Sequence, residues 1–279
     1  MKIKFTKMEG CGNDYIYINC FEENIKSPRA LAVRLSDRRF GVGGDGIILI
    51  LPSKKADAKM RIFNIDGSEG RMCGNGIRCV AKYLYDNNIV RKENIAVETL
   101  SGVKGLKLAI KKGLTETVKV DMGRPELRPA KIPVNLAGKT IIAKPIAIDG
   151  KKYNITCVSM GNPHAVVFCK NVDGLDLAKI GPLFENNSLF PDRINTEFVQ
   201  ILSKTRLKMR VWERGSGETL ACGTGACASV VAAVLNNLVP KGKDIKVELA
   251  GGNLLINYNG DKVFMTGPCK KVFEGVVEM

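Results

Sequence analysis

The feature that most constrains this chain of 279 residues is an internal duplication. Cys222 stands 149 residues after Cys73, and a Gly-x-Gly segment follows each cysteine. Residues 209–212 (MRVW) follow residues 60–63 (MRIF) at the same offset. Two copies of this length are too few and too long for a repeat array. The sequence therefore predicts two related halves, each with the same order of elements.

Hydrophobic periodicity predicts strands and helices in both halves. Ser27-Pro28 is typical of a helix start, and this helix should extend to about Arg38. Helices should also follow Cys73 and Cys222, where apolar residues recur every three or four positions. Short apolar runs predict two strands within 1–19 and single strands at 47–51, 60–64, 95–99, 106–110 and 118–122. We expect an α/β fold of the α+β type, in which each lobe is a mixed or antiparallel sheet wrapped around a central helix.

The best candidate for a boundary between the lobes is Gly123, because prolines follow it two and six residues later. Residues 264–268 resemble residues 120–125 and lie past the end of the second copy, so we expect the last segment to return to the first lobe. The predicted lobes are residues 1–123 with 267–279, and residues 124–266. Clefts between domains commonly hold small ligands, so we expect the active site there.

Composition narrows the classes of partner. The net charge is +15, but the basic residues are scattered and aromatic residues are 6%, which favours a lysine-rich surface over a nucleic-acid partner. No apolar run approaches the ~20 residues that span a membrane, and the N-terminus alternates like a strand. Nine cysteines without paired spacing predict reduced thiols in the cytoplasm. With His164 as the single histidine, we expect no metal site.

Cys73 and Cys222 are the candidate reactive groups. A lone cysteine on a glycine turn is more often structural, but an equivalent pair at two helix starts favours chemistry. Helix N-termini stabilise anions, either a carboxylate or a thiolate whose pKa they lower. Two facing thiols, one ionised and one protonated, would invert a stereocentre by acting on opposite faces. The backbone N–H groups expected to hold a substrate α-carboxylate belong to Gly74, Asn75, Gly223 and Thr224.

Several motifs resemble those of the diaminopimelate epimerase family. They are residues 12–14 (GND), 73–76 (CGNG), 161–164 (GNPH) and 213–225 (ERGSGETLACGTG), together with Asn64. The resemblance covers essentially the whole chain. It implies a cofactor-independent conversion of LL-2,6-diaminopimelate to the meso form, in the synthesis of lysine and peptidoglycan precursors. It also implies a homodimer.

The resemblance assigns roles position by position. Cys73 and Cys222 match the acid/base cysteines, and His164 and Glu213 match residues that tune the thiol pKa values. The substrate-binding positions match Asn13, Asn64, Asn162, Asn195, Glu213 and Arg214, with Gly74-Asn75 and Gly223-Thr224 as the α-carboxylate cradle. Arg214 could hold the distal carboxylate in bidentate fashion. A glutamine of some members is Gly46 here, so we leave Gly46 out of the site.

Two alternatives remain open at this point. One is another two-cysteine racemase of the same fold, of the proline or hydroxyproline type. Such enzymes tend to carry Asp-Arg-Ser-Pro before the second cysteine, whereas this chain has Glu213-Arg214-Gly215 and a longer spacer. The other is a non-catalytic small-molecule binding protein, which would not need both cysteines.

Overall fold

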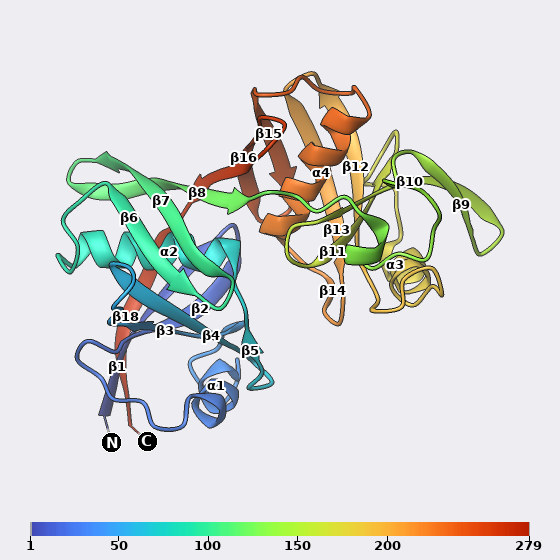
Figure 1. Ribbon diagram of the computed structural model, residues 1–279. Helices are drawn as coiled ribbons and strands as arrows, with labels where there is room; N and C mark the ends of the chain where they lie inside the picture. The colour runs from blue at the N-terminus through green and yellow to red at the C-terminus, as the bar shows by residue number, and fades with distance from the viewer. Residues whose placement is uncertain (1, 279) are drawn as a thin grey trace. The chain divides into compact units, whose positions relative to one another are not determined.

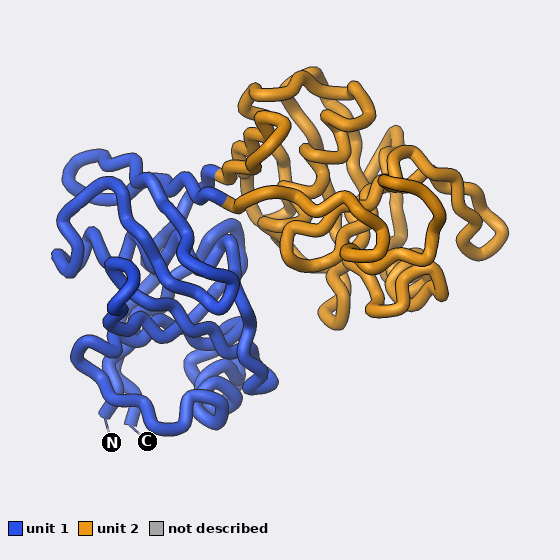
Figure 2. Tube along the Cα trace, viewed as in Figure 1, with its two compact units in different colours: residues 1–121, 266–279 blue, residues 122–265 orange. Residues whose placement is uncertain are grey.

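The computed structural model describes residues 2–278 and divides the chain into two compact units. Unit 1 comprises residues 1–121 and 266–279, and unit 2 comprises residues 122–265 (Figure 2). The boundaries expected from the sequence were after residues 123 and 266. Among residues 2–278, no helix is long and apolar enough to cross a membrane.

Unit 1 is a sheet with two helices. Its strands are β1 (Lys2–Gly10), β2 (Asn13–Asn19), β3 (Gly46–Leu51), β4 (Ala58–Asn64), β5 (Glu69–Gly70), β6 (Asn94–Thr99), β7 (Gly102–Lys111), β18 (Lys270–Glu278) and β8 (Leu114–Gly123), whose last two residues lie past the boundary. Its helices are α1 (Pro28–Ser36) and α2 (Gly74–Asp86). Strand β1 pairs antiparallel with both β2 and β18, so the C-terminal strand is part of unit 1.

Unit 2 repeats this order. Its strands are β9 (Lys144–Ile148), β10 (Lys151–Ser159), β11 (Pro163–Phe168), β12 (Asn195–Ser203), β13 (Arg206–Glu213), β14 (Gly217–Glu218), β15 (Asp244–Leu249) and β16 (Gly252–Tyr258), followed by β17 (Val263–Pro268), which crosses the boundary. Its helices are the 3₁₀ turn η1 (Pro129–Lys131), α3 (Leu177–Glu185) and α4 (Gly223–Leu235). The two-residue strands β5 and β14 are too short to be recognised by periodicity.

The strand pairing shows the duplication directly. In unit 1, β2 runs parallel to β3, β3 antiparallel to β4, and β4 parallel to β6. In unit 2, β11 runs parallel to β12, β12 antiparallel to β13, and β13 parallel to β15. Because strands of both directions occur in each unit, the predicted mixed sheet is confirmed.

A long helix packs against the sheet in each unit. Helix α2 contacts β1, β2, β6 and β7, and α4 contacts β10 to β13 and β16; Figure 1 shows each helix lying among its strands. A second helix in each unit packs on a separate apolar core: α1 on the cluster that includes Ile16, Ile47 and Phe63, and α3 on the cluster that includes Phe184 and Phe198. Helices α2 and α4 both begin one residue after a cysteine, so the packing of each of these helices fixes the position of a sulfur.

Candidate active site

Cys73 occupies the N-cap position of α2 in unit 1. Its backbone is extended, with φ −126° and ψ 120°, so the side chain turns back over the first helical turn. Cys73 Sγ accepts a hydrogen bond from the backbone N–H of Gly76 at 3.3 Å. Ser and Asp usually make this contact at an N-cap. The sulfur therefore pairs with one of the N–H groups that a helix leaves without an internal partner.

Cys222 has the same position at the start of α4 in unit 2. Its backbone is again extended, with φ −113° and ψ 108°. Cys222 Sγ accepts a hydrogen bond from the backbone N–H of Gly225 at 3.3 Å. The prediction that Cys222 lies at a helix N-terminus is confirmed, and Cys73 repeats its geometry.

Each turn requires the glycine that stands three residues after the cysteine. A Cβ atom on Gly76 would lie 2.6 Å from Cδ1 of Ile48, and one on Gly225 would lie 2.6 Å from Oε1 of Glu197. Close-packed interiors do not accommodate such approaches without displacing a neighbour. The Gly-x-Gly spacing is therefore a packing requirement as well as a helix-start signal.

In unit 1, Asn13 connects Cys73 to the carboxylate of Asp45. Cys73 Sγ donates to Asn13 Oδ1 at 3.3 Å, and Asn13 Nδ2 donates to Asp45 Oδ2 at 2.6 Å. Asn13 is the first residue of β2, and its role in substrate binding stays a prediction. Sequence reasoning missed Asp45, although an acidic residue in a glycine-rich loop directly before a buried strand was an available signal.

Asp45 belongs to a small cluster of ion pairs. Arg38 Nη2 lies 2.7 Å from Asp14 Oδ1 and 2.9 Å from Asp45 Oδ1, and Lys7 pairs with Asp14. Burial raises the pKa of Asp14, but hydrogen bonds from Arg38 and Lys7 outweigh this effect and leave the pKa below its usual range. The region behind Cys73 thus combines cations with carboxylates.

Cys222 has carboxylate neighbours instead. Glu213, at the end of β13, lies close enough to Cys222 to affect its pKa, and Glu213 Oε1 accepts from Thr219 Oγ1. Burial raises the pKa of the Cys222 thiol well above its ordinary value, and the charges of Glu213 and Glu197 raise it further. The N–H of Gly225 at the helix start does lower the pKa of the Cys222 thiol, as expected, but the net shift is upward. Desolvation and two carboxylates outweigh the hydrogen bonds from Thr224 and Gly225, which favours the protonated thiol at rest.

A fully buried pair, His164 and Glu197, lies behind this sulfur. His164 Nδ1 is 2.7 Å from Glu197 Oε1, and His164 Nε2 is 3.1 Å from Asn162 Oδ1. Asn162 Nδ2 donates to Thr224 Oγ1 at 3.2 Å, in the first turn of α4. The structure thus brings three predicted residues, His164, Asn162 and Thr224, into one chain of contacts beside Cys222.

Sequence reasoning missed Glu197. It lies in the buried start of β12 between Thr196 and Phe198, and both it and His164 have an exposed fraction of 0%. Its Oε2 has no hydrogen-bond partner among the described residues. A buried carboxylate is costly without a role, and an acidic residue directly before the apolar pair Phe198-Val199 was the available signal.

Two predicted asparagines are engaged within their own units. Asn195 Oδ1 accepts from the backbone N–H of Arg214 at 2.9 Å, and Asn195 Nδ2 donates to Pro163 O at 2.7 Å. Asn64 Nδ2 donates to Ser68 Oγ at 3.0 Å. With both ends of its amide bonded to the backbone, Asn195 supports the segment that carries Arg214.

The remaining predicted residues lie at the helix starts and at the end of β13. Gly74, Asn75 and Gly223 are buried, and Thr224 is half-buried. Arg214 is exposed, and its Nη1 donates to the carbonyl oxygen of Asp192 at 2.8 Å. The exposed guanidinium keeps further donors available for an anionic ligand.

Gly46 stands where some relatives of the resembled family have glutamine. A Cβ atom here would lie 2.1 Å from the carbonyl oxygen of Phe63 and 2.9 Å from the ring of Tyr15. A glutamine therefore requires a different backbone path at the start of β3, which gives a physical reason to keep Gly46 out of the candidate site.

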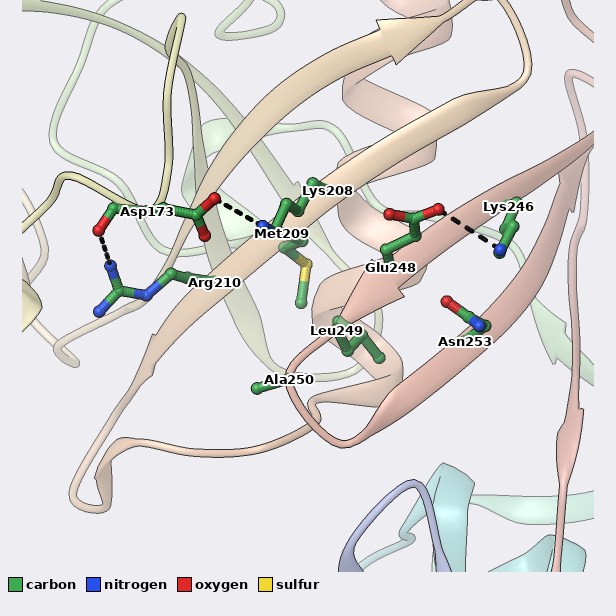
Figure 3. A pocket seen from close by; sticks show the side chains of 9 residues that line it. All are labelled: Asp173, Lys208, Met209, Arg210, Lys246, Glu248, Leu249, Ala250 and Asn253. Atoms are coloured by element: carbon green, nitrogen blue, oxygen red, sulfur yellow. Dashed lines mark hydrogen bonds and ion pairs between the residues drawn. The ribbon is translucent and has the colours of Figure 1, made fainter.

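A hollow of about 590 Å³ lies elsewhere on unit 2 and contains none of the predicted site residues. Figure 3 shows its charged side chains paired with one another: Lys208 of β13 with Asp173 of the segment before α3 at 2.6 Å, and Lys246 with Glu248, both on β15, at 3.4 Å. Because these charges are already neutralised, the hollow does not compete with the cysteine-bearing turns as a candidate site.

The described residues contain no cluster of three or more His, Cys, Asp or Glu side chains that could hold a metal ion. All nine cysteines are free thiols. The expectation that the chain uses no metal stays a prediction.

Solved structures share this fold at low sequence identity. A hydroxyproline epimerase from Agrobacterium vitis has a TM-score of 0.70 at 14% identity, over 99% of this chain and 92% of that chain. A phenazine biosynthesis protein of the PhzF family from Enterococcus faecalis has a TM-score of 0.73 at 13% identity, over 100% of both chains. The chain therefore has the fold shared by these proteins, as predicted.

Curated relatives of higher sequence identity show which family with this fold the chain belongs to. A diaminopimelate epimerase from Acetivibrio thermocellus is 56% identical over 279 residues, which is 99% of each chain. Another from Desulfovibrio desulfuricans is 54% identical over 98% of this chain and 97% of that one. The family model described as diaminopimelate epimerase matches residues 5–128 and 156–272. The chain belongs to the diaminopimelate epimerase family, and it is an isomerase.

Proposed function

We propose that this chain interconverts LL- and meso-2,6-diaminopimelate by moving protons between Cys73, Cys222 and one α-carbon. The observation that carries the proposal is the equivalence of the two sulfurs, each of which caps a helix and accepts an N–H three residues on. A stereocentre is inverted when a proton leaves one face and another arrives on the opposite face. Two thiols, one of them ionised, supply the base and the acid in either direction.

The surroundings of the sulfurs support an assignment of their resting roles. Cys222 is buried beside Glu213 and is the proton donor at rest. Cys73 is only half-buried, so its ionisation costs less desolvation, and it gives its proton to solvent when substrate binds. The Cys73 thiolate then takes the α-proton, and the C–H electron pair stays on the α-carbon. Cys222 delivers its proton to the opposite face and becomes the thiolate.

Loss of the α-proton leaves a carbanion, which the N-termini of α2 and α4 stabilise. As its charge spreads onto the α-carboxylate, N–H groups of Gly74, Asn75, Gly223 and Thr224 hold those oxygens at the positive ends of α2 and α4. We assign Arg214 to the distal carboxylate, and the amides of Asn64, Asn162 and Asn195 to substrate binding or to support of the residues that bind it. This division follows the asymmetry of the substrate, which carries its second charged end on one side.

We also propose that the enzyme works without pyridoxal phosphate, as a homodimer, in the cytoplasm. Two thiols and two helix termini already provide the proton transfers and the charge stabilisation that the cofactor supplies in other racemases. Free cysteines throughout the described chain suit a reducing compartment. Full activity after treatment with hydroxylamine, a carbonyl reagent that captures pyridoxal phosphate, is the expected result.

Isotope exchange tests the proposed function. We expect the α-proton of LL-diaminopimelate to exchange in D₂O and the meso isomer to form, as followed by NMR. L-Proline and trans-4-hydroxy-L-proline, incubated in parallel, should show no exchange. Exchange of these two substrates with none for diaminopimelate would favour the proline-type racemase, and exchange of no substrate would favour a binding protein.

A further inference from the structure

We propose that Asp45 is a positioning residue that holds the amide of Asn13 so that its oxygen, and not its NH₂ group, faces Cys73. The role of this arrangement in catalysis rests on the proposed function. The hydrogen bonds themselves, and the test below, concern only the protonation of Cys73. Asp45 lies in the loop before β3, and its side chain reaches Asn13 and not the sulfur itself.

The contacts decide which way the amide points. An asparagine amide has similar ends, so its orientation follows from its hydrogen-bond partners. Asp45 Oδ2 lies 2.6 Å from one end, and a carboxylate only accepts hydrogen bonds. That end must therefore be the NH₂ group, which leaves Oδ1 at 3.3 Å from Cys73 Sγ. The opposite orientation would set two acceptor oxygens against each other.

Asp45 is itself held at several points. Its backbone N–H donates to the carbonyl oxygen of Asp14 at 2.7 Å, and its Oδ2 accepts the backbone N–H of Asp14 at 3.1 Å. Its Oδ1 accepts from Arg38 at 2.9 Å. With both oxygens in use, the carboxylate cannot rotate away from Asn13 without losing other bonds. The amide is thus fixed by a part of the protein that does not touch the sulfur.

The orientation matters because the two ends of an amide favour opposite states of a thiol. An oxygen accepts from S–H and favours the protonated form, whereas an NH₂ group donates to the thiolate. Titratable neighbours of Cys73 include Tyr17 and Cys79, and burial raises the pKa of both, that of Cys79 to about 12. Asn13 therefore keeps Cys73 protonated until substrate binds, and its oxygen then suits the α-ammonium group of an amino acid.

Unit 2 lacks this arrangement of an aspartate that orients the asparagine amide. Asn162 is the equivalent of Asn13, but position 194, the equivalent of Asp45, is isoleucine. The Asn162 oxygen faces His164 and its NH₂ group faces Thr224. The two asparagines thus present opposite ends to their cysteine-bearing turns, and Asp45 accounts for the orientation in unit 1.

The test measures how the alkylation of Cys73 by iodoacetamide depends on pH in the substrate-free full chain. The tryptic peptide 72–78 contains no other cysteine, so mass spectrometry follows this thiol alone. Asp45→Asn removes the charge but keeps a carbonyl to accept from Asn13, whereas Asp45→Ala removes both. The midpoint of each curve is the pH at which Cys73 is alkylated at half its maximal rate. We expect this midpoint for Asp45→Ala to lie roughly half to one pH unit below that for Asp45→Asn.

A matched control is Asp57→Asn. Asp57 is also a partly buried aspartate of unit 1, where it accepts the backbone N–H of Ala96 at 2.8 Å and pairs with Lys92 at 2.7 Å. Its substitution should leave the Cys73 midpoint at the wild-type value. A shift equal to that of Asp45→Ala would mean that any lost carboxylate has the same effect, which would overturn the proposal.

Equal midpoints for Asp45→Ala and Asp45→Asn would also overturn it, because charge and not amide orientation would then be the contribution of Asp45. If Asp45→Ala does not fold, Asn13→Ala removes the oxygen directly, and the midpoint must fall below wild type for the proposal to stand. A wild-type chain that fails to exchange the α-proton of diaminopimelate would contradict the proposed function but would leave this measurement interpretable.

Discussion

The two cysteine-bearing turns have the same backbone and opposite electrostatic surroundings. In both, the sulfur accepts an N–H at 3.3 Å from the third residue after the cysteine. Cys73 is half-buried and faces an amide oxygen, whereas Cys222 is buried beside Glu213 and Glu197. The two copies therefore share the backbone geometry around each sulfur. The proton affinity of each sulfur is set by side chains that differ between the copies.

The supporting residues differ in the same way. Behind Cys73, Asp14 pairs with Lys7, whose side chain is 8% exposed, and with Arg38, whose side chain is 57% exposed. Behind Cys222, His164 and Glu197 form a pair with no exposure at all. Exposed ion pairs contribute little to stability, but loss of one partner from a buried pair is costly. Substitution of the His164–Glu197 pair should therefore cost more than substitution of the exposed Arg38.

The largest expected effect is on activity and falls on both sulfurs equally. Cys73→Ala and Cys222→Ala should each lower the rate of epimerisation by roughly 10³-fold or more, because each removes one of the two proton-transfer groups. Chiral chromatography of the products measures the rate, and urea unfolding checks that the fold persists. Wild-type activity in either variant would contradict the two-base mechanism.

The next effect concerns stability and should be confined to unit 2. Position 197 corresponds to Ile48 in unit 1, so Glu197→Ile gives unit 2 the residue of its counterpart. It leaves His164 buried without its partner and should cost about 3 kcal/mol of unfolding free energy, measured in urea. The double variant His164→Leu/Glu197→Ile should recover at least half of that loss, because an apolar pair can replace a buried polar one. No recovery would mean that the site requires the pair itself.

The pH dependence of stability should have opposite signs in the two units. The folded pKa of Asp14 is lowered, so its contribution is complete above its unfolded value of 3.8 and is lost as the pH falls towards the folded value. Burial raises the folded pKa of Glu213, although hydrogen bonds from Thr219 and Cys222 lower it. Its contribution is therefore present below the unfolded value of 4.5 and is lost as the pH rises through the folded value.

Two substitutions measure these signs by urea unfolding between about pH 3 and pH 8. Asp14→Asn should destabilise the chain at pH 7 by about 1 kcal/mol, because Lys7 and Arg38 lose their carboxylate partner, and the difference should shrink as the pH falls below 3.8. Glu213→Gln should stabilise it relative to wild type as the pH rises above 4.5, by about 1 kcal/mol. Curves that change in the same direction would contradict the contrast between the two turns.

The sequence was sufficient for the features that depend on local pattern and on the duplication. The apolar spacing after Cys73 and Cys222 predicted both helices, and the glycines marked where they begin. The order of strands followed from short apolar runs. These features depend on residues near one another in the chain, or on the comparison of one half with the other, and both are visible without a structure.

The electrostatics of the site could not be predicted in this way. The pKa of Cys222 depends on Glu197 and Glu213, which two other strands bring to the start of α4. The role of Asp45 depends on the direction of a hydrogen bond to Asn13, which no residue pattern encodes. Asn195 was predicted to bind substrate, but both ends of its amide are bonded to backbone groups.

The smallest expected effect tests whether the copies differ even far from the cysteines. Ser27 and Asp176 are N-cap residues of α1 and α3, related by the offset of 149. Asp176 accepts the backbone N–H of Lys179 at 3.3 Å, whereas the Ser27 side chain makes no capping hydrogen bond.

Asp176→Ala should therefore lower the unfolding temperature by about 2 °C, and Ser27→Ala by less than about 1 °C. Asp176→Asn, which keeps an acceptor, should stay near wild type, and calorimetry resolves these differences. Equal losses for the two alanine variants would show that both caps contribute alike. The contrast between the copies would then be confined to the residues around the two sulfurs, where proton affinity and not helix stability distinguishes them.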